Sequence, residues 1–280
     1  MENVIKAAEK WIESHPYLKD IAALHLACEK AVAESEVIKD MPEITDSKKE
    51  KFKEGESLLQ CCNNLTVNET AGKILTALSS LKDNTELPEK VREAAEKLSN
   101  ISAEKGSEII SSVLENDEKK LKAALKDVNA DEDIITYFAW VSIRKALSGI
   151  KENLEKFISE NIWQKGQCPV CGNDASTAFF KHTKRGRQRF LHCDHCGTEW
   201  DYKRIGCPYC ENIDQKEMSI KDSQDEPDMR IDLCHKCNSY IKTYVGESEK
   251  SAGKEGWASI HLDLLMKDSG FSPKGCLVKP

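Results

Sequence analysis

The chain has 280 residues, of which 32% are charged, and its formal net charge is −7. This length is sufficient for more than one domain with a buried core. The acidic balance argues against binding of nucleic acid or membranes through bulk charge, while leaving room for a local basic patch.

The N-terminal stretch MENVIKAAEKWIESHPYLKD carries charges every few positions and lacks the apolar core of a secretory signal. The longest apolar run, from Ile134 to Ile143, is half of the about 20 residues that a membrane span needs. It is typical of a buried helix instead. We therefore expect a cytoplasmic protein without a membrane span.

Residues 1–163 are predicted to form a helical domain. Apolar residues recur at three- and four-residue steps in 71–82, 87–99 and 131–158, which are rich in Ala, Leu, Lys and Glu. Breaks at SHPY, MPEITDS, NNLTVNET and KDNTELP predict six or seven helices packed as a bundle.

The composition changes after residue 163, where cysteines, aromatics and short alternating segments replace the helical pattern. We expect two small metal modules here, over 164–205 and 206–246. Residues 247–280 are predicted to be a flexible surface linker followed by a short amphipathic helix that Gly270 caps.

Eight of the 12 cysteines occur as four C-x-x-C pairs. In a chain without a secretory signal, this spacing indicates metal ligands rather than disulfides. The predicted ligands are Cys168, Cys171, Cys193, Cys196, Cys207, Cys210, Cys234 and Cys237.

The spacing of the pairs also predicts how they combine. Successive pairs are separated by 21, 10 and 23 residues, and the two long intervals suit hairpins that bring two knuckles together. The flanks repeat as well, because aligning Cys168 with Cys207 also aligns Asn173 with Asn212, and aligning Cys193 with Cys234 also aligns Arg189 with Arg230. We therefore pair the first knuckle with the second and the third with the fourth, as two tandem tetracysteine modules.

The residue after each knuckle often needs a positive φ, so that backbone N–H groups can point at the sulfurs. Gly172, Gly197 and Asn238 suit this conformation, whereas Glu211 suits it poorly and predicts a third knuckle that is either more strained or looser. Zinc and iron both accept four thiolates, so the sequence leaves the metal open.

Other residues near the cysteines are expected to support the modules rather than to bind metal. Because each pair of knuckles already supplies four thiolates, we expect His192, His195 and His235 to lie outside the metal coordination. Trp200 is predicted to fill the small core of the module. Arg204 and Arg230 are predicted to brace the fold or the negatively charged metal sites.

A basic segment separates the first two knuckles. It is predicted to be a charged hairpin turn at Gly186. A more specific interpretation is a docking surface for an acidic patch on a partner, or part of the counter-charge to the thiolates. The candidate partner-binding residues are Lys181, Lys184, Arg185, Arg187 and Arg189.

At these motifs the chain resembles the FdhE family of formate dehydrogenase accessory proteins. The resemblance rests on CPVCG at 168–172, RFLHCDHCGTEW at 189–200, RIGCPYC at 204–210, RIDLCHKCNSYIK at 230–242 and ASIHLDLLMKDSGF at 258–271. It implies a helical N-terminal domain and two rubredoxin-like modules with the eight paired cysteines as ligands. These modules would bind two metal ions, and iron has been proposed as the metal in the family. It also implies a cytoplasmic role in maturation, in which the protein binds the catalytic subunit of a formate dehydrogenase before export.

The leading hypothesis is thus a non-enzymatic assembly factor, and the sequence contains no nucleophile motif or phosphate-binding loop. Two alternatives stay open. One is a rubredoxin-like redox protein that acts on the client enzyme. The other is a nucleic-acid-binding zinc ribbon, which the balance of 13 Lys and Arg against 12 Asp and Glu between Lys165 and Lys242 makes the weaker of the two.

Overall fold

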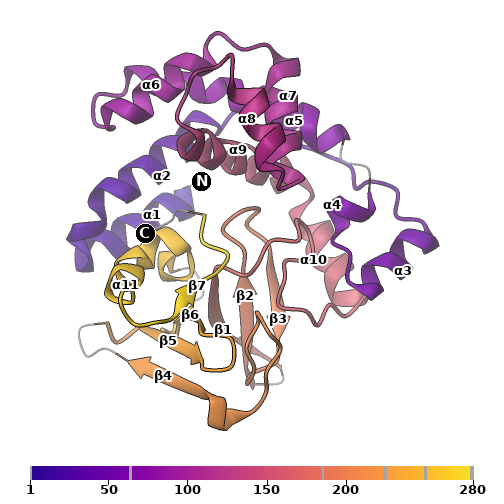
Figure 1. Cartoon of the computed structure of the whole chain (residues 1–280), viewed down its shortest axis with the longest axis vertical. Helices are drawn as coiled ribbons and strands as arrows, with labels where there is room; N and C mark the ends of the chain where they lie inside the picture. The colour runs from indigo at the N-terminus through magenta and orange to yellow at the C-terminus, as the bar shows by residue number, and fades with distance from the viewer. Residues whose placement is uncertain (1, 63–64, 185, 223–225, 249–250, 278–280) are drawn as a thin grey trace. The chain divides into compact units, whose positions relative to one another are not determined.

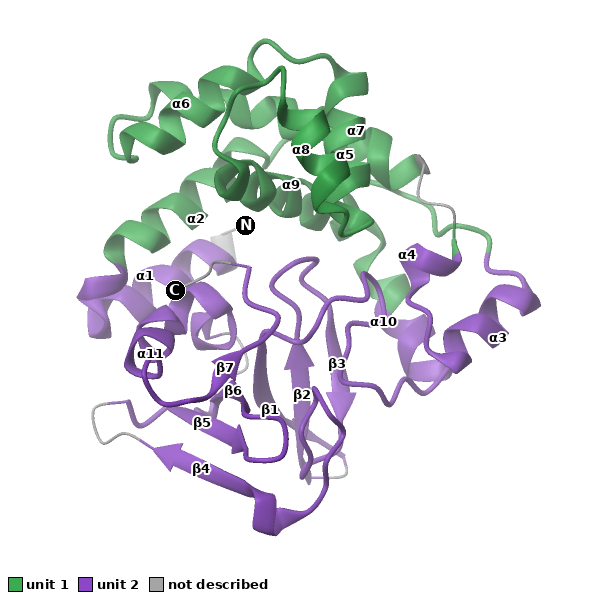
Figure 2. Cartoon of the chain, viewed as in Figure 1, with its two compact units in different colours: residues 1, 19–43, 62–154 green, residues 2–18, 44–61, 155–280 purple. Residues whose placement is uncertain are grey.

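A computed structural model describes residues 2–62, 65–184, 186–222, 226–248 and 251–277 (Figure 1). The chain divides into two compact units (Figure 2). Unit 1 is built mainly from residues 19–43 and 62–154, and unit 2 from residues 2–18, 44–61 and 155–280. The predicted fold class, a helical N-terminal region followed by two tetracysteine modules with β-structure, is confirmed.

Unit 1 is entirely helical in its described part. Its α-helices are α2 (Lys19–Ala31), α5 (Leu65–Ala77), α6 (Glu89–Leu98), α7 (Ala103–Leu114), α8 (Glu118–Leu125) and α9 (Glu132–Leu147), with 3₁₀ turns η2 (Leu78–Asp83) and η3 (Ser148–Ile150). Several helices begin at the capping residues that the sequence provides. The Asp117 carboxylate accepts from the N–H groups of Lys119 and Lys120, and Asp131 caps α9 in the same way.

The core of unit 1 forms around α9, which packs against α5 and α7. The apolar run from Ile134 to Ile143 lies within α9, as expected, and Ile135, Phe138 and Ile143 are fully buried. Helices α5 and α7 approach each other closely at a glycine pair. A Cβ on Gly106 would lie 2.6 Å from the carbonyl oxygen of Gly72, so neither position accepts a side chain without moving a helix.

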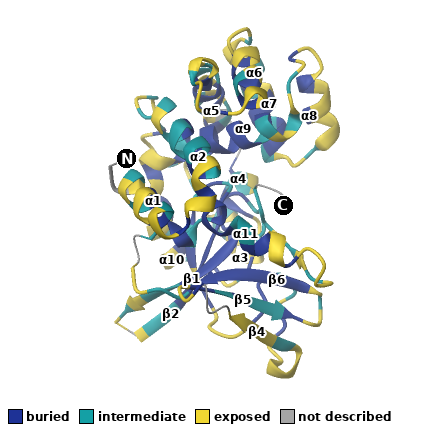
Figure 3. Ribbon diagram, turned by 90° about the vertical axis from the view of Figure 1, so that its left-hand side faces the viewer, coloured by how far each residue is buried: buried dark blue, intermediate teal, exposed yellow. Residues whose placement is uncertain are grey.

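Unit 2 is organised by a seven-stranded sheet with the strand order β3-β2-β1-β6-β5-β4, and β7 pairs with β6. The strands are β1 (Thr177–Thr183), β2 (Gly186–His192), β3 (Glu199–Tyr202), β4 (Met218–Asp222), β5 (Met229–Cys234), β6 (Ser239–Tyr244) and β7 (Ser272–Pro273). Strand β6 is buried throughout, whereas β4, at one edge, is largely exposed (Figure 3).

Each predicted module supplies one antiparallel half of this sheet. Strands β1, β2 and β3 form the first half, and β4, β5 and β6 form the second. The halves join where β1 runs parallel to β6, with Thr177 opposite Lys242. The two modules therefore share one continuous sheet instead of forming two separate sheets.

The predicted domain boundary at residue 163 does not coincide with the division into units. Unit 2 also contains α1 (Glu2–Ser14), η1 (Pro16–Leu18), α3 (Asp46–Glu54), α4 (Leu58–Cys61) and the part of α10 (Lys151–Glu160) from residue 155 onward. The described residues before 163 thus form ten α-helices split between two units, rather than one bundle of six or seven. The cause is long-range packing: the Trp11 indole N–H donates to the Ala258 carbonyl at 3.0 Å, 247 positions away.

The prediction of a flexible linker after residue 246 is wrong for the described residues from 251 onward. This stretch forms two short 3₁₀ turns, η5 (Ala252–Lys254) and η6 (Gly256–Ser259), and then α11 (Ile260–Leu265). Ala252, Trp257 and Ala258 are buried. The Gly256 N–H also donates to the Asp194 carboxylate at 2.9 Å, which ties the segment to the first module.

A further 3₁₀ turn, η4 (Gln215–Glu217), leads into β4. Among the helices of the described residues, none is long and apolar enough to span a membrane.

Candidate metal centres

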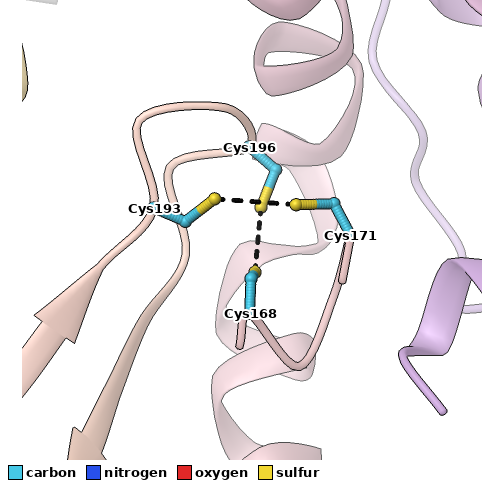
Figure 4. Close-up of side chains that lie close together, drawn as sticks. All are labelled: Cys168, Cys171, Cys193 and Cys196. Carbon is cyan, nitrogen blue, oxygen red and sulfur yellow. Dashed lines mark hydrogen bonds between the residues drawn. The ribbon is translucent and has the colours of Figure 1, made fainter. Parts of the chain in front are cut away.

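The first tetracysteine group joins the segment before β1 to the turn between β2 and β3. Figure 4 shows the four side chains of Cys168, Cys171, Cys193 and Cys196 pointing toward one another. The Cys168 and Cys196 sulfurs are 3.4 Å apart, and those of Cys171 and Cys193 are 3.6 Å apart. All four residues are buried, so the group is enclosed within unit 2.

The second group has the same design in the other half of the shared sheet. The sulfurs of Cys207 and Cys237 are 3.7 Å apart, as are those of Cys210 and Cys234. This group is more open than the first, because Cys210 and Cys237 are only half-buried. The predicted pairing of the first knuckle with the second and the third with the fourth is confirmed.

All four knuckles share one backbone conformation. The residue after the second cysteine has a positive φ in every case: 79° at Gly172, 74° at Gly197, 58° at Glu211 and 51° at Asn238. The Gly172 N–H donates to the Cys168 carbonyl at 2.9 Å, and the Glu211 N–H donates to the Cys207 carbonyl at 3.0 Å. The third knuckle therefore closes like the others. Of the two expectations for Glu211, the structure agrees with local backbone strain and not with a looser knuckle.

This strain predicts that Glu211→Gly stabilises the metal-loaded protein by about 0.5–1 kcal/mol, because glycine adopts a positive φ without a Cβ clash. Urea denaturation followed by circular dichroism measures the change. The matched control is Asn238→Gly, which should gain less because asparagine tolerates this conformation better than glutamate. An equal or larger gain at Asn238 would contradict the strain at Glu211.

The geometry of both groups fits a tetrahedral metal ion. Metal–sulfur bonds of about 2.3 Å place the sulfurs of a regular tetrahedron about 3.8 Å apart. The shortest separations, 3.4 to 3.7 Å, are close to this edge and far longer than the about 2.05 Å of a disulfide bond. A set of four thiolates is a donor set that suits zinc or iron.

Burial opposes ionisation of the thiols in the enclosed first group. It raises the pKa of Cys168 and Cys193 well above the ordinary value, whereas at Cys196 the hydrogen bonds from neighbouring cysteines outweigh burial and lower the pKa. A cation among the sulfurs offsets this cost when the thiols ionise. Polar side chains add donors at the sulfurs: the Asn173 amide donates to Cys171 at 3.4 Å, and Asn212 contacts Cys234 at 3.9 Å.

The histidines beside the cysteines lie outside both groups, since neither ligand cluster found among the described residues includes one. His192 lies between the carboxylates of Asp194 and Glu199, at 3.4 and 3.9 Å. The His235 ring is hydrogen-bonded to the Ser219 hydroxyl at 2.9 Å. Trp200 fills the core as expected: it is 1% exposed, and its indole N–H donates to the Lys165 carbonyl.

The basic segment forms the hairpin of β1 and β2, and most of its described charges are engaged within unit 2. The Lys181 ammonium contacts the Glu199 carboxylate at 2.7 Å, and Arg187 donates to the Val245 carbonyl. Arg189 is 3% exposed, whereas Lys184 is exposed. Arg185 lies outside the described residues. Partner binding at this hairpin stays a prediction, and Lys184 is the residue best placed to take part.

No pattern in the sequence indicates the segment that covers the first knuckle. The N–H groups of Leu58 and Leu59, in α4, donate to the carbonyls of Pro169 and Val170 at 2.8 and 2.9 Å. Helix α4 has only four residues, too few for a periodic pattern to reveal it.

Fold and site together define a class of protein: two tandem tetracysteine modules share one sheet, and helices from both ends of the chain pack on it. Residues 167–204 match the family model described as "FdhE, central domain". These findings confirm the resemblance of this chain to the FdhE family.

Curated relatives carry the name "Protein FdhE homolog". The one from Aquifex aeolicus (strain VF5) is 30% identical over 184 residues, which cover 65% of this chain and 60% of the relative. The one from Proteus mirabilis (strain HI4320) is 27% identical over 189 residues, covering 66% of this chain and 58% of the relative. The chain thus spans no more than 60% of the length of these relatives.

The fold is similar to that in the crystal structure of the FdhE protein from Pseudomonas aeruginosa. The TM-score is 0.63 at 20% sequence identity, and the match covers 100% of this chain and 94% of the other. At this identity the likeness concerns the fold alone.

Proposed function

We propose that this chain is an accessory protein of formate dehydrogenase maturation. In this role it is a cytoplasmic, non-catalytic protein that binds the catalytic subunit of the enzyme before its export. The observation that carries the proposal is the pair of tetracysteine groups at FdhE-type motifs in one continuous sheet.

The proposal includes two metal ions, iron or zinc, one in each group of four cysteines. The sulfur separations and the all-thiolate donor set support it. Each group joins the two ends of a hairpin, and neither module has a large apolar core of its own, so a bound ion supplies much of the local stability. The role of the metals is then to fix the surface that the client contacts.

A redox role is the second candidate, and the openness of the second group favours it. Cys210 and Cys237 are half-buried, so an iron ion there would lie near the protein surface. An iron ion held by four thiolates can alternate between the ferrous and ferric states.

One purification tests both candidates. A tagged chain is expressed in its own host while the cells make formate dehydrogenase, and the eluate is analysed by mass spectrometry and elemental analysis. We expect the catalytic subunit to co-purify and two metal ions per chain. The double variant Cys207→Ser/Cys210→Ser should retain one ion and capture less of the subunit, whereas Cys61→Ser, outside both groups, should behave as the parent chain.

Repeated recovery of the chain without any formate dehydrogenase subunit would contradict the accessory role. The absorption spectrum of the same sample decides the redox candidate, because a colourless, zinc-loaded protein rules out iron-based electron transfer.

A further inference from the structure

A cavity of about 270 Å³ lies between the two modules of unit 2, beside the second tetracysteine group. Residues of β4, β5 and β6 line one side, and the connecting segment 204–209 lines another. Part of the lining is apolar and open to solvent: Ile205 is 49% exposed and Ile220 is 53% exposed. The cavity can admit one small molecule or one or two side chains.

Arginine side chains are prominent in this lining. Arg189, Arg204 and Arg230 line the cavity together with one carboxylate, Asp232, and with Cys207 and Cys234 of the second tetracysteine group. A divalent ion held by the four thiolates of that group would carry about two negative charges, which offset the net positive charge of the arginines and Asp232. The guanidinium groups, with their paired N–H donors, and not the net charge, suit the cavity to an anionic group.

Arg189 is the least satisfied of these charges. Its side chain is 3% exposed, and its Nη1 donates to the Gly206 carbonyl at 2.9 Å. Its Nε and Nη2 have no hydrogen-bond acceptor among the described residues, and the nearest carboxylate oxygen, Asp232 Oδ2, lies 3.5 Å from Nη2. These two nitrogens form one edge of the guanidinium, the edge that matches the two oxygens of a carboxylate.

Asp232 is shared among too many donors to satisfy Arg189. It lies 2.8 Å from Arg230 Nε without hydrogen-bond alignment, and its Oδ2 accepts from the Thr243 hydroxyl at 2.8 Å. Buried charges in proteins are normally paired and hydrogen-bonded. Two guanidiniums around one such carboxylate leave room for a second anion.

Comparison of the two repeats shows that a tetrathiolate group alone does not require this arrangement. Arg189 and Arg230 stand at equivalent positions, but two residues further along the first repeat has Leu191 where the second has Asp232. Cys207 and Cys234 line the cavity, whereas none of the first group's cysteines does. Of the two tetracysteine groups, only the second thus lies beside the arginine cavity.

We propose that this cavity binds a carboxylate carried on an aliphatic body. The carboxylate pairs with the arginines, Asp232 turns aside to expose the Arg189 edge, and the aliphatic part contacts Ile205 and Ile220. Two sources present this chemistry: a free short-chain acid, or an acidic residue within an extended segment of a partner protein. The proposal goes beyond the proposed function and can be tested without formate dehydrogenase.

The test titrates the metal-loaded full chain with glutarate, and separately with the peptide acetyl-Leu-Glu-Leu-amide, while the arginine Nε–H signals are followed by NMR. Glutaramide and the corresponding Gln peptide are the uncharged controls. We expect the carboxylates, and not the amides, to shift the Nε–H signals of Arg189 and Arg230. Tighter binding of the peptide identifies a partner segment as the source, and tighter binding of glutarate identifies a free acid.

Variants separate binding from a structural role. Arg204 is exposed, so Arg204→Gln should leave the fold and metal content unchanged and weaken carboxylate binding about tenfold. Asp232→Asn removes the competing carboxylate and should strengthen binding, which a purely structural ion pair does not predict. Lys216→Gln, which removes an exposed charge outside the cavity lining, should have no effect. If no carboxylate shifts the arginine signals, or if Asp232→Asn weakens binding, the proposal is overturned.

Discussion

Replacing Cys168 with serine is expected to remove one metal ion per chain and to unfold the first module. Cys168 is fully buried in a group whose other three members are also buried, so a lost ligand cannot be replaced by water from outside. Metal binding at a structural tetrathiolate site contributes on the order of 10 kcal/mol, which is comparable to the whole stability of a domain. Elemental analysis measures the lost ion, and hydrogen exchange with mass spectrometry measures the unfolding.

The matched variant is Cys210→Ser in the second group, where the ligand is half-buried. We expect it to lose metal as well, but with faster exchange confined mainly to residues 206–244. Peptides from α9, in unit 1, should exchange as in the parent chain in both variants and serve as the internal reference. Equal protection of residues 167–202 in Cys168→Ser and in the parent chain would contradict a structural role for the first metal.

The pairing of the eight cysteines was predictable because it depends on local features. A C-x-x-C turn fixes two sulfurs within a few residues, and the intervals of 21 and 23 residues leave room for only a hairpin between paired knuckles. The burial of α9 was predictable for a similar reason, since ten consecutive mostly apolar residues favour a buried helix.

The assembly of unit 2 could not be predicted because it depends on contacts between distant segments. The parallel pairing of β1 with β6 joins two repeats that look independent in sequence. The contact of Trp11 with Ala258 and the docking of α4 on the first knuckle leave no local pattern. Helical periodicity identifies a helix but not the surface that it packs against, so it does not show that α1 and α3 belong to unit 2.

The burial of Arg189 could not be predicted for the same reason. In the sequence, Arg189 belongs to a basic hairpin and resembles a surface charge. In the structure it lies at the point where the two modules meet, and it contacts Gly206 of the connecting segment. Arg189 is buried because the two modules join there, and a local stretch of sequence does not show that they join.

The C-terminal segment is held to the sheet by a buried ion pair, and breaking it is expected to be costly. The Lys242 ammonium on β6 lies 2.5 Å from the Asp263 carboxylate on α11, and both side chains are at most 3% exposed. The Tyr240 hydroxyl donates to the same carboxylate at 2.8 Å. We expect Lys242→Met to destabilise unit 2 by about 3–5 kcal/mol, because it leaves a buried carboxylate without its counter-charge.

The double variant Lys242→Met/Asp263→Leu distinguishes this cause from lost packing. Removing both charges removes the unpaired carboxylate, so the double variant should recover much of the stability that the single variant loses. Urea denaturation of the metal-loaded chains, with metal content checked in each, measures the difference. If the double variant is as unstable as the sum of both single variants, packing around β6 and α11 decides the stability of this segment, and the charge pair does not.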